Sequence, residues 1–127
     1  MKNFNDWNQK KTKIHERKKT PFCHERELWW CALGVNIGFE QDGTGREYYR
    51  PVLILKSFSL ETCLIAPLTT STRVHLLRPS VGEIDGKLAH ALISQIRVID
   101  TKRLIRKIGY LDKYIFKDIR KAVKQMI

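Results

Sequence analysis

The stretch that decides the fold of this chain is RPVLIL, residues 50–55. Four consecutive aliphatic residues follow a proline, which is typical of a strand buried on both faces, because alternation is expected only where one face meets water. Pro51 predicts the first strand position, where its missing N–H breaks no central ladder bond. Arg50 is then expected at the rim between a loop and a rigid strand. A cation there suits catalysis, although a solvated strand-end charge is the simpler interpretation of this stretch alone.

Length and charge indicate one basic globular domain. The chain has 127 residues, of which 43% are hydrophobic, enough for one core. Its formal net charge of +11 favours a polyanionic partner: nucleic acid, an acidic protein or an anionic surface. The excess lies at the ends, because residues 1–20 carry seven basic and two acidic side chains and residues 101–127 carry nine and two. A polyanion near Arg50 is therefore expected to draw on the positive potential of the termini.

Cysteine usage and hydropathy predict a soluble cytoplasmic protein. Cys23, Cys31 and Cys63 are odd in number and lack CxxC spacing, so neither a disulfide framework nor a zinc site is expected. The first twenty residues contain no apolar segment, and no stretch approaches the length that spans a bilayer. No group of side chains has metal-ligand spacing, so no metal or cofactor is predicted.

The chain before the deciding stretch divides into an extension and the start of the body. Residues 1–20 are predicted to form a basic, helical extension, with the helix over 4–15, and 21–127 to form the domain. Residues 27–33 predict the first strand, with Trp29 and Trp30 on opposite faces: one in the core, the other a possible stacking surface for a base. A glycine-rich loop follows over 34–49, without the residues of a P-loop.

The chain after that stretch alternates short strands with turns. Residues 62–66 are expected to pair with the strand that follows Arg50 as a hairpin and to end in a run of hydroxyl residues suited to phosphate contact. Asp112 predicts the N-cap of a closing amphipathic helix with cations on its outer faces. The remaining expectations are a strand over 73–77, a turn region over 79–86, one or two strands over 88–99 interrupted by Ser94 and Gln95, a short helix over 101–104 and a strand over 105–111.

These elements predict a mainly β fold with added helices (α+β). The architecture expected is a small SH3-like β-barrel with a C-terminal amphipathic helix and an N-terminal helical extension. Five sequence blocks then stand in a familiar order. They are ELWW (27–30), GFEQ (38–41), RPVL (50–53), APLTT (66–70) and QIRVID (95–100), the last followed by KRL and KIG.

Together these blocks resemble the PemK/MazF (Kid) family of toxins from bacterial type II toxin–antitoxin systems, over nearly all of residues 25–125. The resemblance implies a CcdB/PemK-like barrel, a homodimer, an acidic antitoxin and a metal-independent endoribonuclease that cleaves single-stranded mRNA. It implies Arg50 and Thr69 as the catalytic pair, with Glu40 as a weaker candidate. Residues proposed to bind RNA are Gln41, Thr70, Ser71, Ser94, Gln95 and Trp30. Contact with DNA is expected only indirectly, through an antitoxin.

Departures from the family limit what carries over. Some members place a His in the loop and an Asp before the late Gln, where this chain has Phe39 and Ser94. His75 and His90 match no catalytic position of the family and are interpreted as strand surface residues. The loop between 41 and 50 is longer than in the smallest members.

Two other functions remain open at this point. A CcdB-like, gyrase-poisoning toxin shares the barrel but binds a protein and cleaves nothing, and a non-catalytic RNA-binding barrel needs only the basic termini. The pairing of Arg50 with Thr69 favours the nuclease, because a phosphate clamp and a hydroxyl donor suit attack by a 2′-hydroxyl on its own phosphate.

Overall fold

The computed structural model describes residues 22–33, 49–70 and 78–127. Over this part the chain forms a seven-stranded sheet with the order β4-β5-β3-β2-β1-β7, and β6 pairs with β3 beside this path. Every strand pairing is antiparallel. The predicted mainly β fold is confirmed. The elements are β1 (Glu27–Ala32), β2 (Tyr49–Ser57), β3 (Thr62–Thr69), β4 (Ser80–Ile84), β5 (Lys87–Ala91), η1 (Ile93–Gln95), β6 (Arg97–Asp100), η2 (Thr101–Arg103), β7 (Leu104–Tyr110) and α2 (Lys113–Met126).

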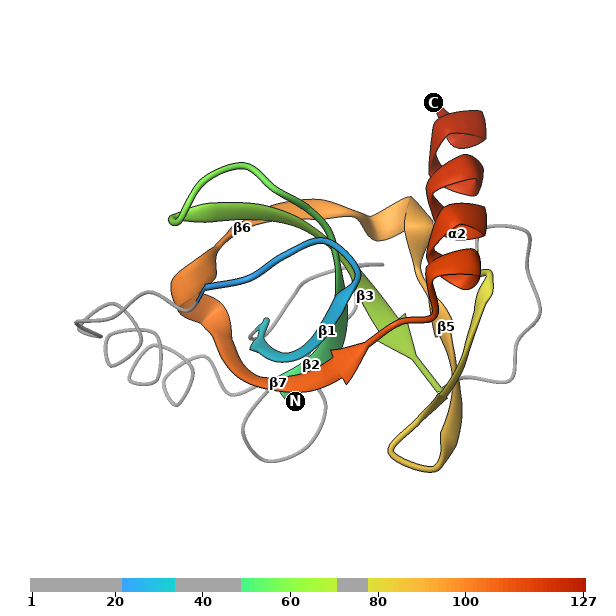
Figure 1. Cartoon of the computed structure of the whole chain (residues 1–127), viewed down its shortest axis with the longest axis horizontal. Coiled ribbons are helices and arrows are strands. Elements are labelled where there is room, and N and C mark those ends of the chain that lie inside the picture. Colours follow the sequence, from blue (N-terminus) through green and yellow to red (C-terminus); the bar gives the residue numbers. More distant parts are fainter. Residues whose placement is uncertain (1–21, 34–48, 71–77) are drawn as a thin grey trace, which may run out of the picture.

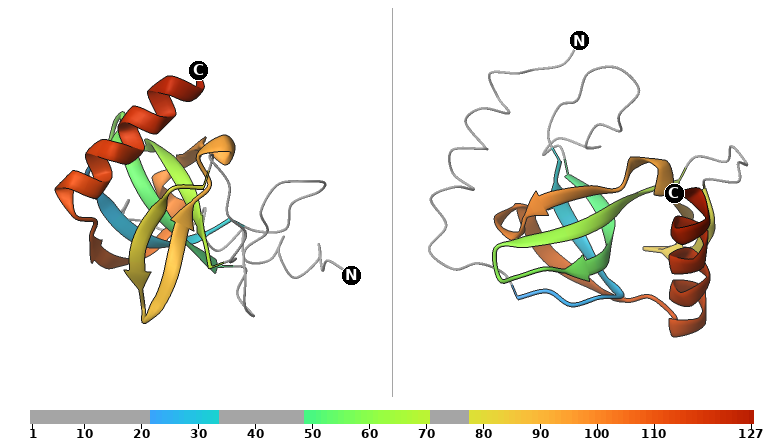
Figure 2. Two further views of the ribbon diagram at one scale, coloured as in Figure 1. Left: turned by 90° about the vertical axis from the view of Figure 1, so that its right-hand side faces the viewer. Right: turned by 90° about the horizontal axis from the view of Figure 1, so that it is seen from above.

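The sheet curls into a half-barrel with one helix beside it (Figure 1). The β4–β5 hairpin extends from the curled part, and α2 runs along the same side of the molecule as this hairpin (Figure 2). Two hydrophobic clusters result. One, which we call the helix-side core, includes Leu53, Ala66, Ala91, Phe116 and Ile119. The other, the barrel core, holds Trp29, Cys31, Val52, Ile54, Cys63, Ile65, Ile99 and Leu104 among its members.

Alternation along β2 and β3 assigns their side chains to the two cores. On β2, Val52 and Ile54 belong to the barrel core, whereas Leu53 and Leu55 belong to the helix-side core. All four are buried, so the expectation of a strand covered on both faces is confirmed. All three cysteines are buried and free.

The start of β2 differs from the expectation. The strand begins at Tyr49, two residues before Pro51, because Tyr49 and Arg50 already pair with Ala32 and Cys31 of β1. The pairing of β2 with β3 starts only at Val52. Pro51 is therefore paired with β1 but not with β3. A proline is tolerated on such a segment if its N position faces the unpaired side. Arg50 is consequently part of the strand and 6% exposed, and its placement as a solvated rim charge was wrong.

The bounds of two further strands also differ from those expected from the sequence. The strand expected over 62–66 continues to Thr69, which puts the first hydroxyl residue of the run inside β3. The turn region expected over 79–86 is mostly the strand β4, whose Val81 and Ile84 are buried. Its tight turn is limited to Asp85 and Gly86, both with positive φ (50° and 79°), as a type I′ hairpin requires.

The C-terminal elements follow the expectations closely. Asp112 caps α2, because its Oδ1 accepts hydrogen bonds from the backbone N–H groups of Tyr114 (2.7 Å) and Ile115 (3.4 Å). The short helix over 101–104 is η2, and residues 88–99 form β5 and β6 with η1 between them. The expected apolar face of α2 packs on the helix-side core, joined there by Phe116.

Several predicted features lie outside the described residues. They are the extension over 1–20 with its helix, most of the 34–49 loop, the strand over 73–77, and the site candidates Glu40, Gln41 and Ser71. Within the described residues, no helix has the length and apolar character needed to cross a membrane.

Candidate active site

Arg50 lies in β2 on the barrel-core side of the sheet. Its cross-strand partner is Cys31 and its neighbour two residues along is Val52, both members of the barrel core. The guanidinium is buried, and its Nη1 donates a hydrogen bond of 3.0 Å to the carbonyl oxygen of Leu68. Because a buried charge is costly without polar partners, this bond both offsets that cost and fixes the direction of the side chain.

Thr69 ends β3 on the same side of the sheet. The β2–β3 register runs as far as Val52 with Pro67, and the hydrogen bond from Arg50 to the carbonyl oxygen of Leu68 brings the guanidinium to the residue before Thr69. Thr69 is 8% exposed and pairs with His90 of β5 on its other side. The structure therefore brings the predicted pair together, across two strands that are joined by a hairpin.

Two more arginines border this end of the barrel core. Arg97 of β6 is the cross-strand partner of Ile65, and Arg103 of η2 donates from Nη1 to the carbonyl oxygen of Ala32 at 3.2 Å. Burial lowers the pKa of Arg103; nearby Cys31 and Asp100 act to raise it, and Arg97 lowers it. Positive potential at this end therefore comes from the middle of the chain as well as from its C-terminal region.

The buried thiol of Cys31 lies among these cations without being a nucleophile. Burial raises the pKa of Cys31 to about 12, although the positive charges of Arg103 and Arg97 oppose that rise. The thiolate form is therefore scarce at neutral pH, and the chemistry available here rests on guanidinium, hydroxyl and imidazole groups. Among the residues that the structure describes, no three His, Cys, Asp or Glu side chains are grouped as metal ligands.

The residues proposed to bind RNA lie at different places. Thr70 is exposed directly after Thr69, at the end of β3. Ser94 and Gln95 lie in η1, whose preceding residue Leu92 donates its N–H to the carbonyl oxygen of Pro67 at 2.8 Å, so η1 lies beside β3. Trp30 is half-buried and lies on the opposite face of the sheet from Arg50, since its cross-strand partner is Pro51.

His90 lies beside Thr69, whereas the sequence alone predicts a strand surface residue. It is half-buried, next to Thr69, and its Nδ1 is buried without a hydrogen-bond partner. The strand pattern held a signal for this placement. Ala89 and Ala91 enter the helix-side core, so the residue between them has to face the other side.

Comparison with known proteins decides the family. A family model described as the PemK-like, MazF-like toxin of type II toxin–antitoxin systems matches residues 24–127. The chain belongs to the PemK/MazF toxin family. A search of curated protein sequences gave no match for this toxin.

Solved structures with the same fold agree with that assignment. A MazF from Deinococcus radiodurans superposes on this PemK/MazF toxin with a TM-score of 0.67 at 16% identity, covering 84% of this chain and 96% of that one. The toxin MazF-mt6 of Mycobacterium tuberculosis gives a TM-score of 0.61 at 22% identity, covering 79% and 94%. An endoribonuclease in complex with its cognate antitoxin from a mycobacterial species gives 0.63 at 16%, covering 82% and 93%.

Proposed function

We propose that this PemK/MazF toxin is a metal-independent endoribonuclease that cleaves single-stranded mRNA and thereby inhibits translation and growth. The observation that carries the proposal is the buried guanidinium of Arg50, held by a hydrogen bond to the carbonyl oxygen of Leu68, the residue directly before the buried Thr69. A fixed cation beside a hydroxyl suits a phosphoryl group whose negative charge increases in the transition state. A MazF structure and a mycobacterial endoribonuclease of the same fold add support.

In this mechanism the RNA supplies its own nucleophile. The 2′-hydroxyl attacks the adjacent phosphorus, the bond to the 5′-oxygen breaks, and the products carry a 2′,3′-cyclic phosphate and a 5′-hydroxyl. Arg50 binds the phosphoryl oxygens and Thr69 donates a hydrogen bond to the same group. Guanidinium is a poor proton donor because its pKa is far above neutral, so Arg50 acts mainly through charge and position.

The other site residues are assigned to binding. Thr70, Ser71, Ser94 and Gln95 would contact phosphate or base edges, and Trp30 would offer a stacking face for a base on the face of the sheet opposite Arg50. Gln41 would bind RNA from the loop, and Glu40 would act there as a base or shape the groove. RNA recognition of this kind depends on unpaired bases stacked on or hydrogen-bonded to side chains.

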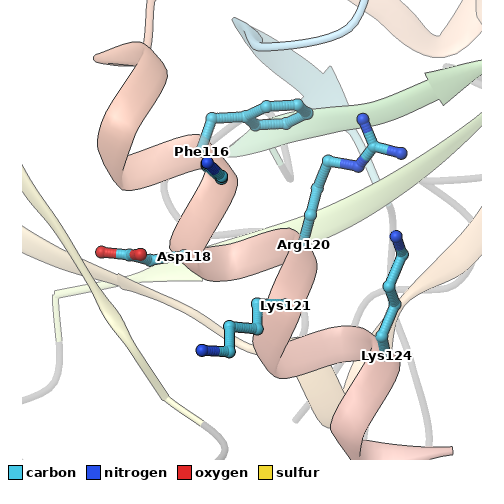
Figure 3. A pocket seen from close by; sticks show the side chains of 6 residues that line it. Phe116, Asp118, Arg120, Lys121 and Lys124 are labelled. Atoms are coloured by element: carbon cyan, nitrogen blue, oxygen red, sulfur yellow. The ribbon is translucent and has the colours of Figure 1, made fainter.

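The proposed protein partner is an acidic antitoxin that binds a homodimer of this toxin and competes with RNA. One solved relative is a complex with its cognate antitoxin. In this chain α2 borders a hollow of about 520 Å³, lined by Phe116, Lys117, Asp118, Arg120, Lys121 and Lys124. Figure 3 shows Arg120 and Lys124 on one side of the helix, with Asp118 and Lys121 on the other. Four cations against one acid would attract an acidic, partly disordered segment.

The test is cleavage of a long RNA by the purified protein in EDTA, with end-labelling of the fragments. We expect chelator-resistant cleavage that leaves 5′-hydroxyl ends. Fragments with 5′-phosphate ends would contradict attack by the 2′-hydroxyl. Binding without cleavage would favour an RNA-binding barrel, and no effect on RNA together with inhibition of gyrase would favour a CcdB-like toxin.

A further inference from the structure

A row of polar side chains crosses four neighbouring strands on the barrel-core side of the sheet. Thr69 of β3 pairs with His90 of β5, and His90 pairs with Ser80 of β4. Arg50 of β2 approaches this row from the other side of β3, because its Nη1 donates a hydrogen bond of 3.0 Å to the carbonyl oxygen of Leu68, the residue before Thr69. Cross-strand partners project from the same face with their Cβ atoms about 4.5–5.5 Å apart. His90 therefore lies beside Thr69, on the side away from β2 and Arg50.

His90 does not contribute to the helix-side core, unlike its neighbours on β5. Its strand neighbours Ala89 and Ala91 are buried in the helix-side core, so they account for the packing of this part of β5. The imidazole is half-buried on the opposite face, and its Nδ1 is buried with no hydrogen-bond partner. Most buried polar atoms in folded proteins are hydrogen-bonded, so an unpartnered one calls for an explanation such as a catalytic role.

The side chains that face His90 come from the strands on either side of it. Its cross-strand partners on β3 and β4 offer neutral hydroxyls, Thr69 and Ser80. Arg50 is the charged group near Thr69, and the ionisable side chains on and beside β4 and β5 are Arg78, Glu83, Asp85 and Lys87. No ion pair of His90 with a carboxylate occurs among the residues that the structure describes.

The proposed reaction needs a group of this kind. As the 2′-hydroxyl attacks phosphorus it has to lose its proton, and a guanidinium cannot accept one. Histidine is the side chain whose ordinary titration falls between pH 5 and 8, which suits a general base near neutral pH. We propose that His90 is a further catalytic residue, the general base of the RNA cleavage at the Arg50–Thr69 site. This inference rests on the proposed endoribonuclease function.

The step balances as a transesterification. His90 takes the proton of the 2′-hydroxyl as the bond from O2′ to phosphorus forms. The bond from phosphorus to O5′ breaks, and the leaving 5′-oxygen takes a proton from water. The products are a 2′,3′-cyclic phosphate and a 5′-hydroxyl, and no electron donor or acceptor takes part. Arg50 and Thr69 hold the phosphoryl oxygens throughout.

The experiment compares the wild-type chain with His90→Ala and His90→Gln in single-turnover cleavage of one labelled RNA from about pH 5 to pH 9. We expect the maximal rate to fall by about 10²- to 10⁴-fold in both variants. The rise of rate with pH below neutrality should disappear in both. Added imidazole should restore a measurable part of the rate to His90→Ala alone, because the small base can occupy the space of the lost ring.

Controls separate catalysis from folding. Leu88→Ala, an exposed residue two positions away on the same face of β5, should cleave at the wild-type rate, and thermal unfolding should be recorded for every variant. A cleaving wild type with His90 variants of unchanged rate and pH profile would overturn the inference alone. So would a slow His90→Ala that folds normally and gains nothing from imidazole. A wild type that cleaves no RNA would remove the proposed function, and the inference with it.

Discussion

Arg50 is both part of the buried sheet and the cation of the proposed reaction. It lies beside two members of the barrel core, Cys31 on the paired strand and Val52 two residues along its own strand. Its charged side chain is nevertheless buried, with the residue 6% exposed. Its bond to the Leu68 carbonyl explains how that charge is tolerated. An arginine held in this way has its donors oriented before substrate arrives, so little reorganisation is needed at the moment of reaction.

Replacing Arg50 by alanine should therefore affect both activity and stability. We expect cleavage to fall by about 10²-fold or more, as for the loss of one strong transition-state donor. Unfolding free energy should also drop, by roughly 1.5–3 kcal/mol, because a hydrogen bond to a charged group is lost. Single-turnover rates and urea unfolding measure the two effects. Arg50→Lys is the control, since it keeps the charge but not the forked geometry; near-wild-type cleavage by Arg50→Ala would contradict the assignment.

Thr69 should matter less than Arg50 because it contributes a single neutral donor. Thr69→Ala is expected to cost roughly 1.5–3 kcal/mol of transition-state stabilisation, which is about 10- to 150-fold in rate. Thr69→Ser keeps the hydroxyl and should retain most of the activity. The comparison of kcat/KM for the two variants is the measurement, and equal losses in both would point to packing of the threonine methyl group instead.

At the scale of elements, a buried carboxylate joins β1 to β7. Glu27 is 1% exposed and accepts hydrogen bonds from the His24 N–H (2.8 Å) and the Trp29 Nε1–H (3.0 Å). Its other oxygen lies 2.8 Å from the Nζ of Lys107. Burial alone would raise the pKa of Glu27, but the bonds from Lys107, His24 and Trp29 together outweigh burial and lower it. The carboxylate is therefore ionised in the folded chain.

This lowered pKa predicts how stability depends on pH. The folded state binds fewer protons at Glu27 than the unfolded state, so the contribution of Glu27 is complete above its ordinary pKa of about 4.5 and is lost as pH falls through the folded value. Glu27→Gln should lower the unfolding free energy by roughly 1–3 kcal/mol at neutral pH. The difference from wild type should shrink below about pH 4.5.

Urea unfolding of both proteins across that range is the measurement. Glu25→Gln is the matched control, because Glu25 is 45% exposed and its contact with Arg120 is 3.8 Å, so a small effect at every pH is expected. A Glu27→Gln deficit of constant size at all pH values would refute the electrostatic account of this network.

At the scale of the whole molecule, much of the excess positive charge lies in the C-terminal region rather than being spread evenly along the chain. The C-terminal region contributes Arg103 near the site and four cations on α2 around the hollow. The helix packs on the core through Phe116 and Ile119, and its four cations are exposed. A surface of this kind speeds association with an acidic partner more than it strengthens the complex.

Charge reversal tests that role. Lys121→Glu with Lys124→Glu should slow association with an acidic antitoxin segment several-fold and flatten its salt dependence, while RNA cleavage stays measurable. The matched control reverses two exposed lysines elsewhere, Lys56 and Lys87. Arg120 is left in place because it contacts Glu25. Stopped-flow mixing over a salt series is the measurement, and equal slowing by both pairs would assign the effect to net charge alone.

The sequence by itself determined the central strand, the closing helix and the family, whereas β4 was expected as a turn. An apolar run bounded by proline predicts a buried strand, a capping aspartate predicts where α2 begins, and five ordered blocks predict the toxin family, because each of these signals is local in the chain. Local patterns also predict which face a side chain takes once its strand is known. The pairing of Arg50 with Thr69 came instead from the resemblance to the family, and their catalytic role stays a prediction.

The tertiary structure alone decided how deep that site lies and what borders it. Tyr49 and Arg50 join β2 because β1 pairs with them, and this pairing buries a charge that the proline signal had placed at the rim. His90 lies beside Thr69 because β5, which lies 21 residues further along the chain at His90, pairs with β3. Register between distant strands depends on how whole faces pack, which a single sequence specifies only through its complete set of contacts.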